Sequence, residues 1–287
     1  MKIIINLKCL KLIRSCDSIR PLALLALALT LSACNGKAPI QPENTSSAPA
    51  APPISVEQMV ERNRATEKAT SSLIKSRARI QESGSETREI RMTVYRKWEA
   101  DGSQKMLVEF NTPEEKDRAG LISISPQGEV EGTRYAQSND SFVTSKDPAG
   151  EDGLFGMSLQ ELADGQPEKY DFKFVKEETV GTTPAYRLDG KLKPGAASKF
   201  PRMVVLMSKD NFTTLAIEFY DAQDTIARKI TMDKVEQIQG HWARMKWTVD
   251  NIARKKNIVF ETESAKYDQN LNESIFTRDN LKKLASR

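Results

Sequence analysis

The side chains that could support catalysis or metal binding are few and lie far apart along the chain. His241 is the only histidine, and a lone histidine without a partner thiol cannot form the nitrogen and sulfur ligand set of a zinc site. The chain has no Gly-x-Ser-x-Gly nucleophile motif, no phosphate-binding glycine loop and no acidic calcium loop. Asp101, Asp221 and Asp224 lie in segments of turn composition, where hydrogen bonds to the nearby backbone account for a carboxylate. We therefore expect no catalytic residue, no metal, no cofactor and no enzyme activity, and interpret His241 as a loop histidine at a strand start.

The thiol of Cys34 is the side chain whose surroundings specify a reaction. Residues 31–34 read Leu-Ser-Ala-Cys, which resembles the bacterial lipobox, where small residues admit the signal peptidase and the cysteine receives a diacylglyceryl group. A basic leader and an apolar run over residues 22–31 precede it, and ten helical residues span only about 15 Å, too little to cross a bilayer. The sequence thus predicts a lipoprotein signal peptide over residues 1–33 and lipid attachment at Cys34. The alternative is an ordinary secretion signal followed by an incidental cysteine.

Cleavage at that position would change both the cysteine count and the charge. The other two cysteines, Cys9 and Cys16, lie in the leader, so the mature chain could form no internal disulfide. The leader also carries five of the 43 basic residues and one of the 39 acidic residues, which leaves 38 of each. A balanced chain lacks the electrostatic footprint of a nucleic-acid-binding protein, so we expect no nucleic-acid partner.

The residues after Cys34 predict a tether and then a folded domain. Residues 34–54 are rich in proline, alanine and serine, a composition that cannot bury enough apolar surface to fold and that favours an extended chain. Ser55 and Gln58 have the spacing of a capping box, which predicts that a helix begins there. An apolar stripe extends the expected helix as far as Ile74, although residues 70–72 are poor helix formers. Residues 55–287 form the predicted domain.

Most of this domain has the alternating pattern of antiparallel strands. The first example is Ile90, Met92 and Val94, which alternate with polar residues and are followed by an Asp-Gly turn at residues 101–102. The same pattern recurs with short turns between the runs: residues 106–110, 170–174, 186–188, 203–207, 215–219, 226–232, 245–249 and 258–260. About ten such strands cannot remain flat. We expect a mainly β fold, an incomplete, half-open antiparallel barrel with an N-terminal helix and short helical cover.

Residues 126–169 do not fit this rhythm. They are rich in glycine and proline and carry few apolar residues. Residues 158–162 predict one or two helical turns. We interpret the segment either as a lid or variable insertion or as an irregular crossover.

The apolar side chains of the strands are the feature of the domain that could bind a ligand. On a curved sheet one side of each strand faces the concavity, and a single helix would cover it incompletely. An apolar lining of this kind suits an acyl chain, because each buried methylene contributes about 0.8 kcal/mol. The alternative is that the same residues fill a solid core. Candidate lining residues are one alternation phase of the strands: Ile90, Met92, Val94, Val108, Phe110, Val205, Ile217, Phe219 and Trp247.

Several segments, in order and spacing, resemble one known family. They are residues 106–113 (Met-Leu-Val-Glu-Phe-Asn-Thr-Pro), 120–122 (Gly-Leu-Ile), 204–209 (Val-Val-Leu-Met-Ser-Lys), 217–221 (Ile-Glu-Phe-Tyr-Asp), 240–251 with Gly-His-Trp, Met-Lys and Val-Asp-Asn, and 275–281 (Ile-Phe-Thr-Arg-Asp-Asn-Leu). The chain is similar over residues 77–284 to the LolA-like outer-membrane lipoprotein-sorting proteins. Residues 134–136 and 156–159 depart from the family pattern.

The resemblance implies an incomplete barrel of the LolA/LolB type whose apolar cavity holds lipid or the acyl chains of a lipoprotein. Asn35 after the cysteine, rather than Asp, is what bacterial sorting rules associate with the outer membrane. We therefore expect a lipid-anchored protein of the outer membrane facing the periplasm, with a role in lipoprotein sorting or envelope lipid transport. The alternative is a non-catalytic envelope sensor or scaffold that has a filled core and binds a protein partner.

Overall fold

The structure is a computed structural model that describes residues 54–111, 119–146, 167–196 and 198–287. All of these belong to one compact unit. The expected signal peptide, Cys34, the tether up to residue 53 and the helical turns expected at residues 158–162 lie outside the described residues.

A short N-terminal helix, α1 (Val56–Glu67), precedes the strands. They are β1 (Ser71–Glu82), β2 (Arg88–Trp98), β3 (Gln104–Phe110), β4 (Ala119–Ile124), β5 (Val130–Ala136), β6 (Ser141–Ser145), β7 (Tyr170–Val180), β8 (Thr183–Leu192), β9 (Arg202–Ser208), β10 (Thr214–Tyr220), β11 (Ile226–Ile238), β12 (His241–Asn251) and β13 (Lys256–Tyr267). Short 3₁₀ turns lie at η1 (Gln137–Asn139), η2 (Pro167–Lys169) and η3 (Glu273–Phe276), and the chain ends with helix α3 (Arg278–Ala285).

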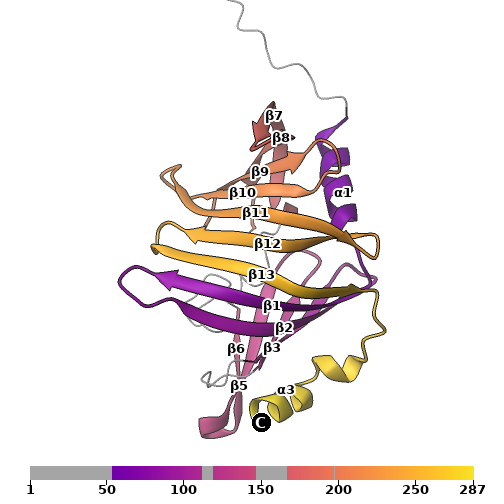
Figure 1. Ribbon diagram of the computed structural model, residues 1–287, viewed down its shortest axis with the longest axis vertical. Helices are drawn as coiled ribbons and strands as arrows, with labels where there is room; N and C mark the ends of the chain where they lie inside the picture. The colour runs from indigo at the N-terminus through magenta and orange to yellow at the C-terminus, as the bar shows by residue number, and fades with distance from the viewer. Residues whose placement is uncertain (1–53, 112–118, 147–166, 197) are drawn as a thin grey trace, which may run out of the picture. The chain divides into compact units, whose positions relative to one another are not determined.

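The thirteen described strands form a single antiparallel sheet that does not close. Its order is β6-β5-β4-β3-β2-β1-β13-β12-β11-β10-β9-β8-β7, so β6 and β7 are its edges. Two meanders, β1–β6 and β7–β13, are therefore joined where β1 pairs with β13. The ribbon shows the sheet curling, with β3, β5 and β6 behind β1 and β2 (Figure 1). This confirms the expected half-open antiparallel architecture.

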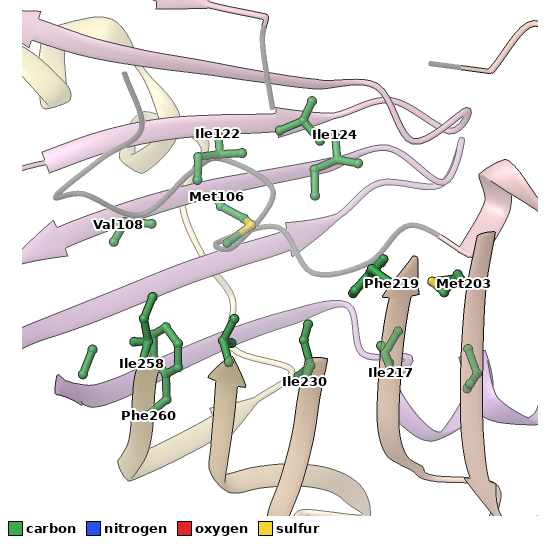
Figure 2. Close-up of a cluster of buried hydrophobic side chains, with 14 of the residues drawn as sticks. Met106, Val108, Ile122, Ile124, Met203, Ile217, Phe219, Ile230, Ile258 and Phe260 are labelled. Carbon is green, nitrogen blue, oxygen red and sulfur yellow. The ribbon is translucent and has the colours of Figure 1, made fainter. Parts of the chain in front are cut away.

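The core lies on the inner face of the curl. Alternate residues of the strands meet there, and side chains of β3 and β4, such as Met106 and Ile122, point toward side chains of the β9–β13 half, such as Ile217 and Ile258 (Figure 2). Helix α1 packs on the same cluster through Met59, which is fully buried. Sheet curvature and one helix thus enclose an apolar interior.

Helix α1 begins as the sequence predicts. The Ser55 hydroxyl accepts a hydrogen bond from the Gln58 backbone N–H at 3.2 Å, and the Gln58 side chain accepts one from the Ser55 N–H at 3.0 Å. Asn63 ties the helix to the sheet, because its Nδ2 donates to the carbonyl of Phe212 at 2.7 Å. The expectation that the helix reaches Ile74 is wrong: it ends at Glu67, and Ile74 lies in β1 between β2 and β13.

The opposite, outer face of the sheet carries helix α3. Leu281 and Leu284 of this helix are buried against Leu107 of β3 and Tyr135 of β5. A second apolar layer is therefore present behind β3–β5, and these strands are covered on both faces.

The sequence pattern misses β1, β4, β5 and β6. The first four residues of β1 (residues 71–74) lie within the stretch assigned to the helix, and the rest of the strand received no assignment. Strands β5 and β6 lie in residues 126–169, which were expected to be irregular, and α3 explains why: with cover on both faces, β5 buries residues of both phases and loses the simple alternation. The sheet therefore has thirteen described strands where about ten were expected.

Candidate functional site

The candidate lining residues lie on one face of the sheet. Strand pairing places Val94 opposite Val108, Ile217 opposite Val205 and Trp247 opposite Phe260. All of the candidates belong to the same inner cluster, with Val94 and Trp247 partly exposed and the others buried: Ile90, Met92, Val94, Val108, Phe110, Val205, Ile217, Phe219 and Trp247. The phase inferred from alternation is therefore the concave one.

Part of this inner face is hollow. The cavity, here called the inner pocket, has a volume of about 120 Å³, enough for more than one water molecule. It lies over five neighbouring strands, β3, β2, β1, β13 and β12, and is lined by Ser72, Ile74, Ser76, Met92, Val94, Arg96, Trp98, Met106, Val108, Trp242, Arg244, Trp247, Phe260, Thr262 and Tyr267.

Aromatic side chains make up much of the wall of the inner pocket. The rings of Trp247 and Phe260, which are cross-strand neighbours, stack with centroids 4.7 Å apart and planes 5° from parallel. Trp98 and Trp242 complete the set, so all three tryptophans of the chain line this pocket. Large rigid rings bury much apolar surface at little entropic cost, which suits contact with a hydrocarbon chain.

A second cavity, the helix-side pocket, adjoins the inner pocket and is larger, about 610 Å³ on the same measure. Helix α1, the β2–β3 and β4–β5 turns and strands β9 and β10 contribute to it. Its lining is Glu61, Asn63, Arg64, Ala65, Lys68, Arg96, Trp98, Asp101, Gly102, Gln104, Ile124, Ser125, Pro126, Gly128, Pro167, Glu168, Met203, Val205, Thr214, Ile217 and Arg244. Arg96, Trp98 and Arg244 line both cavities and so mark where they meet.

The candidate residues divide into three groups. Four line the inner pocket: Met92, Val94, Val108 and Trp247. Val205 and Ile217 line the helix-side pocket. Ile90, Phe110 and Phe219 line neither of these two pockets and are packed in the core, with 0%, 4% and 1% of their surface exposed.

The sequence interpretation missed the polar members of the site. Arg96 continues the phase of Ile90, Met92 and Val94 and could have been found by extending that alternation. Arg244 could not have been found in this way. It lies three residues before Trp247, and strand residues at that spacing normally point to opposite faces, yet both line the same pocket. The pairing of β11 with β12 skips Met245, and this bulge reverses the phase of the strand.

His241 opens β12, where it was expected at a strand start, and lies outside both pocket linings. Its Nε2 is 2.7 Å from Oδ2 of Asp268. The Thr70 backbone N–H and then His241 lower the pKa of Asp268 by hydrogen bonding. Asp268, which follows β13, thus links the start of β12 to Thr70 in the segment between α1 and β1. Within the described residues, no cluster of three or more His, Cys, Asp or Glu side chains could hold a metal.

In the part of the chain that the structure describes, no helix is both long enough and apolar enough to cross a membrane.

Comparisons with known proteins agree with this architecture. A family model described as an uncharacterized protein matches residues 102–283, more than half of the chain. No curated protein matches the sequence.

Three solved structures share the fold at low sequence identity. A DUF1329 family protein from Desulfovibrio piger has a TM-score of 0.71 and 18% identity over 78% of this chain and 96% of its own. A domain described as an outer membrane lipoprotein-sorting protein domain, from Vibrio parahaemolyticus, has a TM-score of 0.70 and 18% identity over 78% and 97%. A LolA superfamily protein from Nitrosomonas europaea has a TM-score of 0.63 and 13% identity over 79% and 99%.

The chain therefore belongs to the family whose model spans residues 102–283, and its domain has the LolA-like fold.

Proposed function

We propose that this protein is a non-enzymatic lipoprotein of the cell envelope that binds the acyl chain of a lipid or a lipoprotein in the inner pocket. The observation that carries the proposal is an unfilled, largely apolar cavity on the concave side of a LolA-like sheet. Transfer of each methylene from water into such a cavity contributes about 0.8 kcal/mol. A chain of several methylenes would thus bind without any polar contact.

The proposed location follows from the N-terminal residues. Lipid on Cys34 would hold the protein at the outer membrane facing the periplasm, and residues 34–54 would act as a tether for the domain over residues 55–287. Twenty extended residues reach about 60 Å. This arrangement fits a membrane-bound acceptor or donor in lipoprotein sorting or envelope lipid transport.

Blocking the cavity tests the binding proposal. Val94 lines the inner pocket opposite Val108, so Val94→Trp should place an indole where the hydrocarbon would lie. Exclusion of two or three methylenes costs about tenfold in affinity or more. We expect delipidated Val94→Trp protein to bind laurate at least about tenfold more weakly than the unchanged protein in a calorimetric titration.

Val143→Trp is the matched control, because Val143 is exposed on edge strand β6 and should tolerate the same substitution without loss of binding. Mass spectrometry of gently purified protein should also detect a co-purifying lipid. If the unchanged, delipidated protein took up no laurate, the acyl-binding proposal would fail, and the scaffold alternative would be favoured.

A further inference from the structure

The inner pocket is packed shut at one end. In each of the five strands that line it, the residue two positions beyond the last lining residue belongs to the core cluster. None of these five residues exposes more than 4% of its surface. They close the pocket on the side of the β1–β2 turn and are here called the pocket floor: Ala78 of β1, Ile90 of β2, Phe110 of β3, Val249 of β12 and Ile258 of β13.

Strand pairing makes the pocket floor continuous. Ile90 lies opposite Ala78, and Val249 lies opposite Ile258. Ile258 points from β13 toward Val108 of β3 across the interior (Figure 2). The floor therefore spans the width of the inner pocket and is not a single protruding side chain.

The opposite end of the inner pocket lies at the rim of the sheet. Its lining there includes Trp98, the last residue of β2, Tyr267, the last residue of β13, and Trp242, the second residue of β12. The helix-side pocket begins at this level, because Trp98 lines both cavities. The inner pocket thus has one end that joins a larger cavity and one end that is closed.

The distance from the rim to the floor limits the length of a bound tail. Along β2 the lining runs from Trp98 to Met92, which is about 20 Å at the rise of a strand. An extended peptide advances about 1.2 Å per backbone bond, and a zigzag hydrocarbon chain advances by a similar amount, so about 16 carbons is an upper limit. The small volume of the pocket, about 120 Å³, favours tails below that limit.

We infer that the inner pocket selects acyl tails by length: a tail enters from the helix-side pocket with its methyl end first and stops against the pocket floor. The remaining carbons of a longer tail would lie in the helix-side pocket, whose lining includes the charged residues Glu61, Arg64 and Lys68, and would add little to affinity. This inference rests on the proposed acyl-binding function, and it adds the direction of the tail and the longest chain that is favoured.

A series of chain lengths tests the inference. Delipidated protein purified after expression of the full chain is titrated with octanoate, decanoate, laurate, myristate, palmitate and stearate, each below its micelle concentration. Tryptophan fluorescence reports binding, since all three tryptophans line the inner pocket. Affinity should rise by about fourfold with each added methylene until the tail reaches the floor, and by less than about 1.5-fold thereafter. We expect this break at palmitate or a shorter chain.

Two substitutions move the closed end in opposite directions. Ile90→Ala shortens a floor side chain and should shift the break to a longer chain by about one member of the series. Ser76→Leu, at the last lining residue of β1, fills space above the floor and should shift the break to a shorter chain by about one member. A folded Ser76→Leu protein is sufficient for the test if Ile90→Ala does not fold.

Ile80→Ala is the matched control, because Ile80 is 3% exposed in the same core and lies one row beyond the floor. It should leave the break at the same chain length as in the unchanged protein.

A steady rise in affinity through stearate would overturn the length limit and leave acyl binding in place. A break at the same chain length in the unchanged protein and in every folded floor variant would also overturn it, because the floor would then not set the limit. Absence of binding by every member of the series would overturn both the inference and the function on which it rests.

Discussion

At the scale of single residues, Glu261 shows how the outer face of the sheet is held. It lies on β13, where Oε2 accepts hydrogen bonds from Nη2 of Arg77 at 2.5 Å and from Nη2 of Arg79 at 2.9 Å. Lys246 of β12 lies 3.4 Å from Oε1. Hydrogen bonds from Arg77, and then Arg79, lower the pKa of Glu261 to about 2. One carboxylate thus links three strands across the junction of the two meanders.

This pKa makes the contribution of Glu261 depend on pH in a defined window. The pKa of Glu261 in the folded protein, about 2, is below its unfolded value of 4.5, so the stabilisation is complete above pH 4.5 and is lost as the pH falls toward 2. Glu261→Gln should lower the free energy of unfolding at pH 7, and its difference from the unchanged protein should shrink at pH 3. Urea denaturation at both pH values measures this. Glu86→Gln, at an exposed site in the β1–β2 turn, is the control and should change the free energy of unfolding at neither pH. If Glu261→Gln lowered the free energy of unfolding equally at pH 7 and pH 3, the stabilisation would not come from the ionised carboxylate.

The inner face could be predicted from sequence to the extent that strand alternation is regular. Ile90, Met92 and Val94 share one face because successive strand residues point to opposite sides. The pattern does not separate residues that border a hollow from residues packed against each other: Val94 lines a pocket, whereas Ile90 is core. That difference depends on which strands face each other across the curl, which no local pattern encodes.

At the scale of elements, helix α3 offers a direct test of packing. Leu281 is fully buried between α3 and the outer face of β3–β5. Leu281→Ala should destabilise the protein by about 2–5 kcal/mol, because the removed side chain leaves a cavity. Urea denaturation should reveal this as a lower midpoint.

Lys283→Ala provides the control for α3, since Lys283 is exposed on the same helix and exposed substitutions usually change stability by less than about 0.5 kcal/mol. If the two alanine variants had equal stability, α3 would not be part of the cooperative fold.

The sequence also predicts all seven strands of the second meander but only β2 and β3 of the first. Strands β9 and β10 alternate and are bounded by short turns, so their period is readable. Strand β1 begins with Ser71 and Ser72, and its half-buried positions are spaced too irregularly to separate it from the preceding helix. Strand β5 is covered by the sheet interior on one face and by α3 on the other, so its pattern reflects two partners at once. The burial pattern of these strands is therefore set by packing against other elements and not by local propensity.

At the scale of the whole molecule, attachment to the membrane is proposed to depend on the lipid at Cys34. Cys34→Ala should block lipid transfer, so the protein should move from the membrane fraction to the soluble periplasmic fraction. Mass spectrometry should find the corresponding acyl mass on the unchanged protein only. Stable anchoring usually requires two lipid chains, which a diacylglyceryl cysteine carries.

Cys16→Ala is the matched control for this test, because Cys16 lies ahead of the proposed cleavage site and would be removed with the leader. Its variant should remain in the membrane fraction. Membrane retention of the Cys34→Ala protein would refute the anchor and leave the acyl-binding proposal untouched.

The pairing of β1 with β13 sets the order in which the protein can acquire its native state. Along the chain these are the first and last of the described strands, yet in the sheet they are central neighbours, each with a paired strand on both sides. In a chain that emerges N-terminus first from a ribosome or a translocation pore, the backbone groups on one edge of β1 lack their hydrogen-bond partners until β13 has emerged. Contacts between such distant segments are formed late and slowly, and the open side is exposed to aggregation meanwhile. The sheet cannot be completed before β13 has been synthesised. Folding would therefore compete little with passage of the unfolded chain across the membrane.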